Sequence, residues 1–335
     1  MKNLIYLIFI FFISCGESGP EEKSVSGEAL GTTFHIKFYS EKDISVQKAL
    51  DSIFEMVNNS MSTYQPDSDI SKLNSGDSLV VVDSLFREVF WLSQKVFKES
   101  DGYFDPTVGD LVNMYGFGPE KGIKTIDSST IDSLMPFVGL QKVKISSEGK
   151  VIKESPEIYL DFNAIAKGYT IDLIGNYFDS QNVEHYLIEL GGELLAKGKN
   201  LSKESFWTVG IDDPNQPEGE RALMVALELK NRAMATSGNY RKYRKDSISG
   251  RIYVHTINPK TGYPEKSNLL SASVLAPNCA LADAYATAFM AMGLEKAKKL
   301  LPELQNVDAY LIFSEGNEIK TFASPGFQDV LVELE

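Results

Sequence analysis

Polar and hydrophobic residues alternate along several short segments of the chain, and this alternation predicts β-strands. The clearest case is residues 30–39, where Thr32, Phe34, Ile36 and Phe38 occupy every second position. Further strands are predicted at 141–147, 157–161, 185–190, 206–211, 222–229, 232–236, 251–257, 270–276, 308–313 and 329–334.

Helices are predicted where apolar residues recur every three or four positions, as Leu50, Ile53, Phe54 and Val57 do. These helices span residues 44–59, 84–99, 126–135, 164–179 and 279–292. The segment "GYFDPTVGDLVNMYGFGP" (102–119) is rich in Gly and aromatic residues and predicts loops around a short helix. Many strands with few helices between them indicate an α+β fold of antiparallel sheets with helices on one side, and no boundary divides the chain in two.

The N-terminal segment "MKNLIYLIFIFFISCGE" resembles an export signal. It has a basic start at Lys2 and an apolar run from Leu4 to Ile13, which is too short to span a membrane. Small residues flank Cys15 directly after this run, as in bacterial lipoprotein signals, although Phe12 stands where Leu is usual. We therefore expect Cys15 to become the lipidated first residue of an exported protein. An ordinary secretory signal with a chance cysteine is the alternative.

This interpretation sets the domain organisation. We expect a signal peptide at residues 1–14, a polar tether at 15–27 and one domain at 28–335. If Cys15 carries lipid, the second cysteine, Cys279, has no disulfide partner and is predicted to be a small core residue.

The chain is acidic, and this limits its partners. Its 335 residues carry a formal net charge of −13, which becomes −14 without residues 1–14, where one Lys and no acid lie. Nucleic acid is therefore not an expected partner, because phosphate backbones need a basic surface. An anionic ligand would need a local metal ion, a Lys or helix N-termini.

The predicted helix at 279–292 contains an unusual pair, Asp283 and Thr287, in an alanine-rich sequence. Residues four apart lie on one helix face, so both side-chain oxygens point the same way. Two hard oxygen donors suit Mg²⁺, which also keeps water or phosphate ligands. Alternatively, Asp283 pairs with a Lys or caps a backbone group, and Thr287 bonds to its own helix.

Three further clusters carry candidate chemistry. Asp161 and Lys167 flank a strand-to-helix turn in "LDFNAIAKGYTIDLI", where backbone amides and Lys167 suit an anion, although a surface ion pair explains them equally well. His255 stands in a strand before an Asn-Pro turn, either for proton transfer or as a structural residue. Tyr64 precedes Gln65-Pro66 and either stacks on a planar ligand or closes the turn. The glycine-rich motifs of the common nucleotide folds are absent.

These clusters occur in a specific order from residue 31 to 293: "GTTFHI", "MSTYQPDSDISKLN", "GYFDPTVGDLVNMYGFG", "DFNAIAKGYTID", "IELGGELLAKG", "WTVGIDDP", "ATSGNYRKY", "HTINPKTGYP" and "ALADAYATAFMAMG". In this order they closely resemble the ApbE/Ftp family of FAD:protein FMN transferases over nearly all of the mature chain. The resemblance implies two intimately packed subdomains of the ApbE-like, tunnelling-fold-like type, with FAD between them. Family members are typically periplasmic lipoproteins, which agrees with the start of this chain.

The resemblance also implies a reaction and a site. The family uses Mg²⁺ and moves FMN from FAD to a Thr or Ser hydroxyl of an exported protein, such as a subunit of an RNF- or NQR-type complex, with release of AMP. By motif position, Asp283, Thr287 and the carbonyl of Ala164 are the expected metal ligands. The expected FAD contacts are Leu30, Tyr64, Asp105, Pro106, Thr107, Asp161, Lys167 and Ile257. His255 is the expected base, with orientation of a metal ligand or of the phosphate as its alternative role.

Three positions depart from the family pattern. Leu30 replaces a common Met and Tyr115 a frequent Trp, so apolar or aromatic character is kept. Asn258 replaces a common Asp, which puts any role of a charge there in doubt. Two other functions stay open at this stage: an FAD pyrophosphatase that passes the phosphoryl group to water, and a periplasmic flavin-binding protein without turnover.

Overall fold

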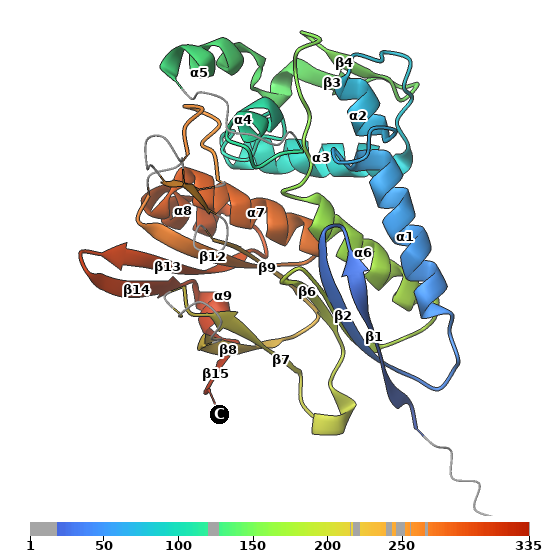
Figure 1. Ribbon diagram of the computed structural model, residues 1–335. Helices are drawn as coiled ribbons and strands as arrows, with labels where there is room; N and C mark the ends of the chain where they lie inside the picture. Colours follow the sequence, from blue (N-terminus) through green and yellow to red (C-terminus); the bar gives the residue numbers. More distant parts are fainter. Residues whose placement is uncertain are drawn as a thin grey trace, which may run out of the picture.

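An eight-stranded antiparallel sheet forms the centre of the molecule (Figure 1). The computed structural model describes residues 19–119, 127–214, 216, 222–238, 243–245, 252–254, 256–264 and 267–334. In sheet order, the strands are β1 (Glu21–Ala29), β2 (Thr32–Ser40), β5 (His185–Leu190), β6 (Glu193–Lys197), β9 (Ala233–Gly238), β12 (Leu269–Ala276), β13 (Asp308–Glu315) and β14 (Glu318–Ala323). Each neighbouring pair is antiparallel.

One face of this sheet is covered by helices. The helix α6 (Ala166–Ser180) packs on β5 and β6, and α7 (Cys279–Met292) packs on β9 and β12. A second layer, α1 (Val46–Met61) and α3 (Ser84–Glu99), packs against α6 and α7. The remaining helices are α2 (Asp69–Asn74), α4 (Gly109–Met114), α5 (Ser128–Leu134), α8 (Leu294–Leu300) and α9 (Pro325–Gln328).

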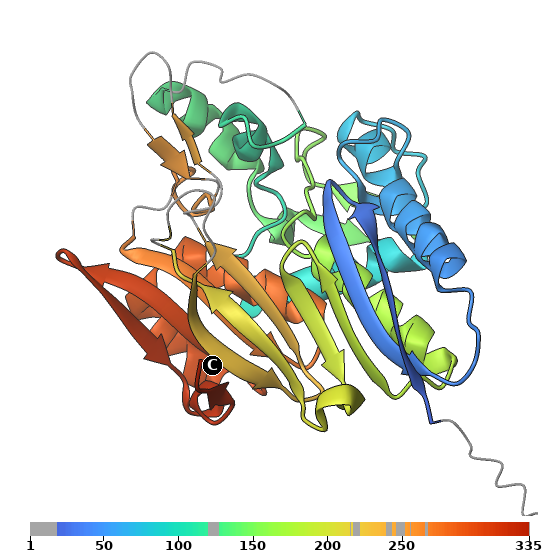
Figure 2. The ribbon, with the colours of Figure 1, turned by 60° about the horizontal axis from the view of Figure 1, so that its bottom comes forward.

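The opposite face is covered by a small sheet of β15 (Leu331–Val332), β8 (Leu223–Leu229) and β7 (Trp207–Asp212). Figure 2 looks from this side, with the strands in front of α6 and α7. Along β13, Ala309, Leu311 and Phe313 belong to the core beneath the helices. Tyr310 and Ile312 point the other way, into the core beneath the small sheet. Burial on both faces explains why β13 is continuously apolar from Ala309 to Phe313.

A separate, smaller core lies around α4 and α5, above α7 in Figure 1. Its buried members are Leu111, Met114, Tyr115, Ile131 and Ile257. Because Ile257 comes from a chain segment far from α4 in sequence, this cluster holds the loop at 256–264 against the 102–119 segment. Two two-stranded ladders complete the structure: β3 (Val143–Ile145) with β4 (Val151–Lys153), and β10 (Tyr243–Lys245) with β11 (Ile252–Val254).

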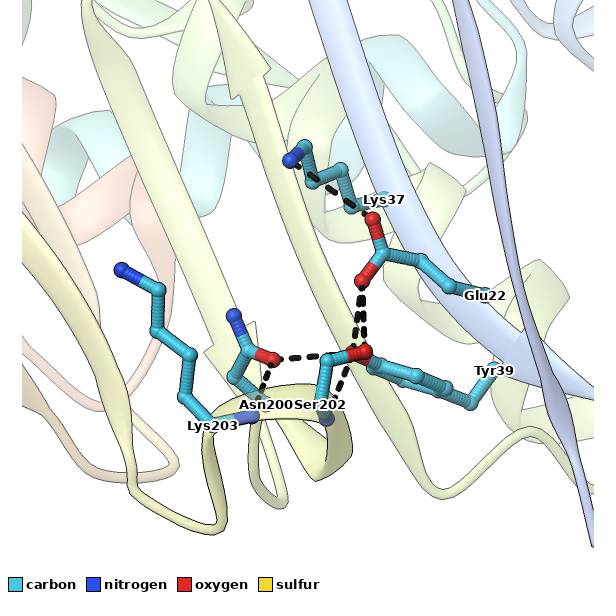
Figure 3. A network of polar contacts seen from close by, with 6 residues as sticks. All are labelled: Glu22, Lys37, Tyr39, Asn200, Ser202 and Lys203. Atoms are coloured by element: carbon cyan, nitrogen blue, oxygen red, sulfur yellow. Dashed lines mark hydrogen bonds and ion pairs between the residues drawn. The ribbon is translucent and has the colours of Figure 1, made fainter.

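The N-terminal hairpin is anchored by a polar network (Figure 3). The Tyr39 hydroxyl lies 2.7 Å from a carboxylate oxygen of Glu22 and 2.8 Å from the side-chain carbonyl of Asn200. It also accepts the Ser202 N–H at 3.0 Å, and Lys37 lies 3.7 Å from Glu22. The hydrogen bond from Tyr39 lowers the pKa of Glu22. The first strand is thereby fixed at its outer end.

Two sequence predictions need correction. Residues 21–27, assigned to the tether, lie in β1; the pattern was missed because β1 is an edge strand in which Lys23, Val25 and Ala29 are only partly buried. Residues 157–161 form no strand. The Leu160 N–H bonds the side chain of Asn74 at 2.9 Å and the Asp161 N–H bonds the Pro106 carbonyl at 2.7 Å, so loop partners replace a strand ladder.

Other predicted elements differ mainly in extent. The strand at 329–334 shortens to β15, and the strand at 251–257 to β11 with a bridge at Ile257. The hydrophobic pattern did not indicate β4, β6, β10, β14, α2, α8 or α9. Residues 1–18, which include the predicted signal peptide and Cys15, lie outside the described residues. Among the helices that are described, none combines the length and the apolar character that crossing a bilayer requires.

Candidate active site at the start of two helices

The metal-binding prediction falls where α6 and α7 cross. Asp283 lies in the second turn of α7 and is 6% exposed; one of its carboxylate oxygens accepts the Gly168 N–H, in the first turn of α6, at 3.2 Å. Thr287 follows one turn later and is partly buried. Ala164 stands two residues before the start of α6. The crossing therefore brings Asp283, from the motif "ALADAYATAFMAMG", to the first turn of α6, which belongs to the motif "DFNAIAKGYTID".

Lys167 joins the same junction. Its ammonium group forms an ion pair with Glu193, at the start of β6, where the Gly191-Gly192 turn places it. Burial by itself would lower the pKa of Lys167, but the charges of Glu193 and Asp283 outweigh this and raise it. Lys167 therefore stays charged, as a group that meets a diphosphate must.

The junction carries more negative than positive charge. Burial raises the pKa of Asp283, and also that of Glu193, with Lys167 opposing both shifts. In the described part of the chain, the second carboxylate oxygen of Glu193 is buried and has no hydrogen-bond partner. Two buried carboxylates facing one ammonium group form an environment that a bound cation would stabilise.

The donor set fits a hard cation. Among the described residues, no three His, Cys, Asp or Glu side chains are grouped as a metal site. A cation here would therefore depend on one carboxylate, the Thr287 hydroxyl and a backbone carbonyl such as that of Ala164, with the remaining positions left to water or phosphate. Mg²⁺ prefers oxygen ligands and is usually bound in this way, through one or two carboxylates and substrate phosphates.

The residues predicted to contact FAD near 105–107 form a tightly bonded turn. One oxygen of Asp105 accepts the Thr107 N–H at 2.9 Å and its hydroxyl at 2.6 Å, and the other accepts the Leu140 N–H at 3.3 Å. The Pro106 carbonyl accepts the N–H of Asp161. Burial raises the pKa of Asp105 to about 6, against these hydrogen bonds. The structure thus joins two predicted contact segments, and the Asp105 carboxylate holds the turn.

Tyr64 lies near the same segment. Its side chain is among the exposed aromatics at 59%, and its hydroxyl donates to the Phe117 carbonyl at 3.4 Å. Burial of the hydroxyl end and the neighbouring charge of Asp161 raise the pKa of Tyr64. The Asn163 amide donates to Thr63 at 3.3 Å, which ties the Asp161 loop to the Tyr64 turn. An exposed aromatic ring is thus available to a planar ligand.

Two cavities flank these residues. One, of about 380 Å³, lies between the β1–β2 turn and α1 and is lined in part by Leu30, Phe54 and Gln65. The other, of about 430 Å³, is lined in part by Asp105 and Lys260. Leu30 and Asp105 therefore border different cavities.

The last predicted segment surrounds His255, which lies outside the described residues. Ile257 is buried, and its bridge to Pro264 closes a loop. In that loop the Asn258 side-chain carbonyl accepts the Lys260 N–H at 2.9 Å. This contact uses an oxygen that Asn and Asp both carry, so the turn itself needs no charge at position 258.

Sequence analysis missed two acidic residues of the junction, Glu193 and Asp172. Glu193 directly follows the Gly191-Gly192 pair of the motif "IELGGELLAKG", and Asp172 stands between Ile171, which is fully buried, and Leu173, which is partly buried. In the sequence, an acidic residue among apolar residues was the signal that could have found Glu193 and Asp172.

Comparison with known proteins shows the family of the chain. The model of the ApbE family matches residues 30–311. The chain belongs to the ApbE family. Relatives named "FAD:protein FMN transferase" include that of Haemophilus influenzae, 33% identical over 317 residues (91% of this chain, 90% of the relative), and that of Vibrio cholerae, 33% identical over 348 residues (99% of each). The Escherichia coli K12 relative is 30% identical, covering 96% of this chain and 95% of the relative.

Solved ApbE structures share the fold. The flavin transferase ApbE from Vibrio cholerae superposes with a TM-score of 0.82 at 31% identity, covering 93% of this chain and 100% of that chain. The apo flavinyl transferase ApbE from Pseudomonas stutzeri gives a TM-score of 0.82 at 28% identity, covering 93% and 97%. These findings confirm the predicted family, the α+β fold and an enzyme of the transferase class. The individual site residues and the domain boundaries stay predictions.

Proposed function

We propose that this member of the ApbE family is a Mg²⁺-dependent FAD:protein FMN transferase. It moves FMN from FAD to a Thr or Ser hydroxyl of an exported protein and releases AMP. The observation that carries the proposal is the α6–α7 junction, where buried Asp283, with Thr287 one turn away, lies beside the charged Lys167. The relatives' names, FAD:protein FMN transferase, supply the reaction class.

The side chains have distinct roles in this proposal. Asp283, Thr287 and the Ala164 carbonyl would hold Mg²⁺, which when bound neutralises diphosphate charge. Lys167 meets the diphosphate as a permanent cation in an acidic protein. Tyr64 would offer an aromatic face to the flavin, and Leu30, Pro106 and Ile257 would make apolar contacts with FAD.

The reaction is a displacement at phosphorus. The acceptor hydroxyl oxygen attacks the phosphorus on the flavin side of the diphosphate, the bond from that phosphorus to the bridging oxygen breaks, and AMP leaves with this oxygen. The hydroxyl proton passes to His255, the base that the sequence motif "HTINPKTGYP" predicts. A positioned base of this kind contributes about 10²–10⁴-fold to rate.

Incubation with FAD, Mg²⁺ and an exported target protein that carries an acceptor Thr tests the proposal. We expect the target's mass to increase by one FMN group and an equal amount of AMP to form, and EDTA to stop both. Free FMN and AMP with an unmodified target would instead identify an FAD pyrophosphatase. Intact FAD after prolonged incubation would identify a flavin-binding protein.

We also propose that the enzyme is exported and lipid-anchored through Cys15, and that it faces the periplasm. The support is the apolar run before Cys15 and the small residues that flank it. Radiolabelled palmitate supplied to expressing cells should label the wild-type protein but not the C15S variant. Equal labelling of both proteins would contradict the anchor.

A further inference from the structure

A second carboxylate controls the start of α7 from the neighbouring helix. Asp172, on α6, accepts the Cys279 N–H at 2.7 Å with one oxygen and the Ala280 N–H at 2.9 Å with the other. These are the first two residues of α7, whose N–H groups have no partner within their own helix. The Asn278 side chain accepts the next N–H, from Leu281, at 2.9 Å. The first turn of α7 is therefore fully bonded.

The two helices cap one another. While Asp172 on α6 bonds the first turn of α7, Asp283 on α7 bonds the Gly168 N–H in the first turn of α6. Gly168 allows this close crossing, because a Cβ atom there would lie 2.3 Å from the carbonyl oxygen of Cys279. Both the spacing and the rotation of the helices are thus fixed at their starts.

The first turn of α7, which Asp172 bonds, begins the helix face that carries the predicted metal ligands. Cys279, Asp283 and Thr287 are each four residues apart, so they follow one another along one side of the helix. A shift or rotation of the first turn would therefore carry Asp283 and Thr287 with it, relative to Lys167 on α6.

We propose that Asp172 is a positioning residue for the cation site, which it serves by holding the first turn of α7 against α6. It acts through Asp283 and is not itself a metal ligand. This inference rests on the proposed function, because it assumes that Asp283 and Thr287 bind the cation. Loss of a carboxylate that orients a metal ligand typically weakens metal affinity or activity by about 10–100-fold.

The test compares D172N with a capping variant elsewhere, D83A. Asp83 caps α3 by accepting the Phe86 N–H at 2.7 Å and a hydrogen bond from Ser60 at 3.0 Å, both with the same carboxylate oxygen and both outside α6 and α7. D172N removes one of the two oxygens that accept N–H groups of α7, whereas Asn at position 83 would keep the single accepting oxygen, so alanine is used there. Mn²⁺ binding is measured by electron paramagnetic resonance, alone and with ADP, which has the diphosphate and adenosine of FAD but no flavin to transfer. Thermal unfolding is measured in parallel.

We expect both variants to lower the Tm, but only D172N to weaken Mn²⁺ binding, by about 10–100-fold. At saturating Mg²⁺, D172N should regain most of the wild-type kcat. G168A, which pushes the same two helices apart, should also weaken Mn²⁺ binding and serves if D172N does not fold.

Wild-type Mn²⁺ affinity in D172N, together with a Tm loss like that of D83A, would show that Asp172 is only a helix cap. A wild-type protein that binds no Mn²⁺ with or without ADP would instead overturn the proposed metal-dependent function, and the inference with it.

Discussion

Replacing Lys167 by methionine tests whether a single ammonium group neutralises Glu193 inside the protein. Glu193 is 5% exposed; one carboxylate oxygen contacts Lys167, and the other has no hydrogen-bond partner among the described residues. Removing one member of a buried ion pair costs about 3–5 kcal/mol, because it leaves an uncompensated charge. The Lys167 side chain is 28% exposed, so solvent screens part of the pair. We therefore expect K167M to lose about 3 kcal/mol of unfolding free energy near neutral pH.

The loss should depend on pH in a defined direction. Burial raises the pKa of Glu193 above its usual value of 4.5, and Lys167 opposes that shift, so the pKa rises further in K167M. Between 4.5 and the raised pKa, the folded state holds more protons than the unfolded state. Stability of K167M should therefore fall as pH increases through this window, by up to about 1.4 kcal/mol per pH unit.

Urea unfolding in EDTA, followed by circular dichroism from about pH 4.5 to 8, measures both effects. K320M is the control, because Lys320 pairs with Glu315 on the exposed β13–β14 hairpin, where an ion pair contributes about 0–1 kcal/mol. The double variant K167M/E193Q, which has neither charge, should recover much of the loss. The reasoning is refuted if K167M matches K320M at every pH. If the double variant recovers nothing, the loss comes from packing rather than charge.

Three further predictions address the site. D283A should abolish Mg²⁺-dependent turnover while circular dichroism shows an intact fold, and retained activity would remove the metal assignment. H255A should lower the rate of FMN transfer by about 10²–10⁴-fold with little change in FAD affinity; the base assignment is wrong if affinity falls and the turnover of bound FAD does not. Burial raises the pKa of Asp105 from 3.8 to about 6, so the folded state binds the extra proton and wild-type stability falls as pH rises from about 4 to 6. D105N should lack this slope and gain about 3 kcal/mol relative to wild type over that range, as measured by urea unfolding.

The hydrophobic pattern of the sequence predicted those helices and strands whose structure depends mainly on their own residues. The helix α7 begins and ends where the Asn278 cap and the apolar run indicated, because both signals lie within its own sequence. The β1 strand was missed because it pairs on one side only and stays largely exposed, so its sequence has no hydrophobic alternation to detect. The order of strands in the sheet could not be predicted, since β6 pairs with β9 across a long connection.

The same limit applies to the site. The order of the motifs predicted Asp283 as a metal ligand and Lys167 as an FAD contact. The structure brings the starts of α6 and α7 together, so these two residues lie at one junction. Glu193 and Asp172 gained their roles only through packing: one becomes the counter-charge of Lys167, and the other bonds a helix more than one hundred residues away in sequence. A single acid in an apolar segment has no partner that sequence spacing can reveal.

The charge balance of the junction bears on the proposed binding of a diphosphate in an acidic protein. Two helix N-termini meet there, but carboxylates of Asp172 and Asp283 already occupy N–H groups of both first turns. The helix ends are therefore not free to attract an anion by themselves, as they are in glycine-rich phosphate loops. Lys167 provides one positive charge against Asp283 and Glu193, so a diphosphate arriving alone would meet a negative surplus. A divalent cation would offset that surplus, which supports the proposed Mg²⁺ dependence.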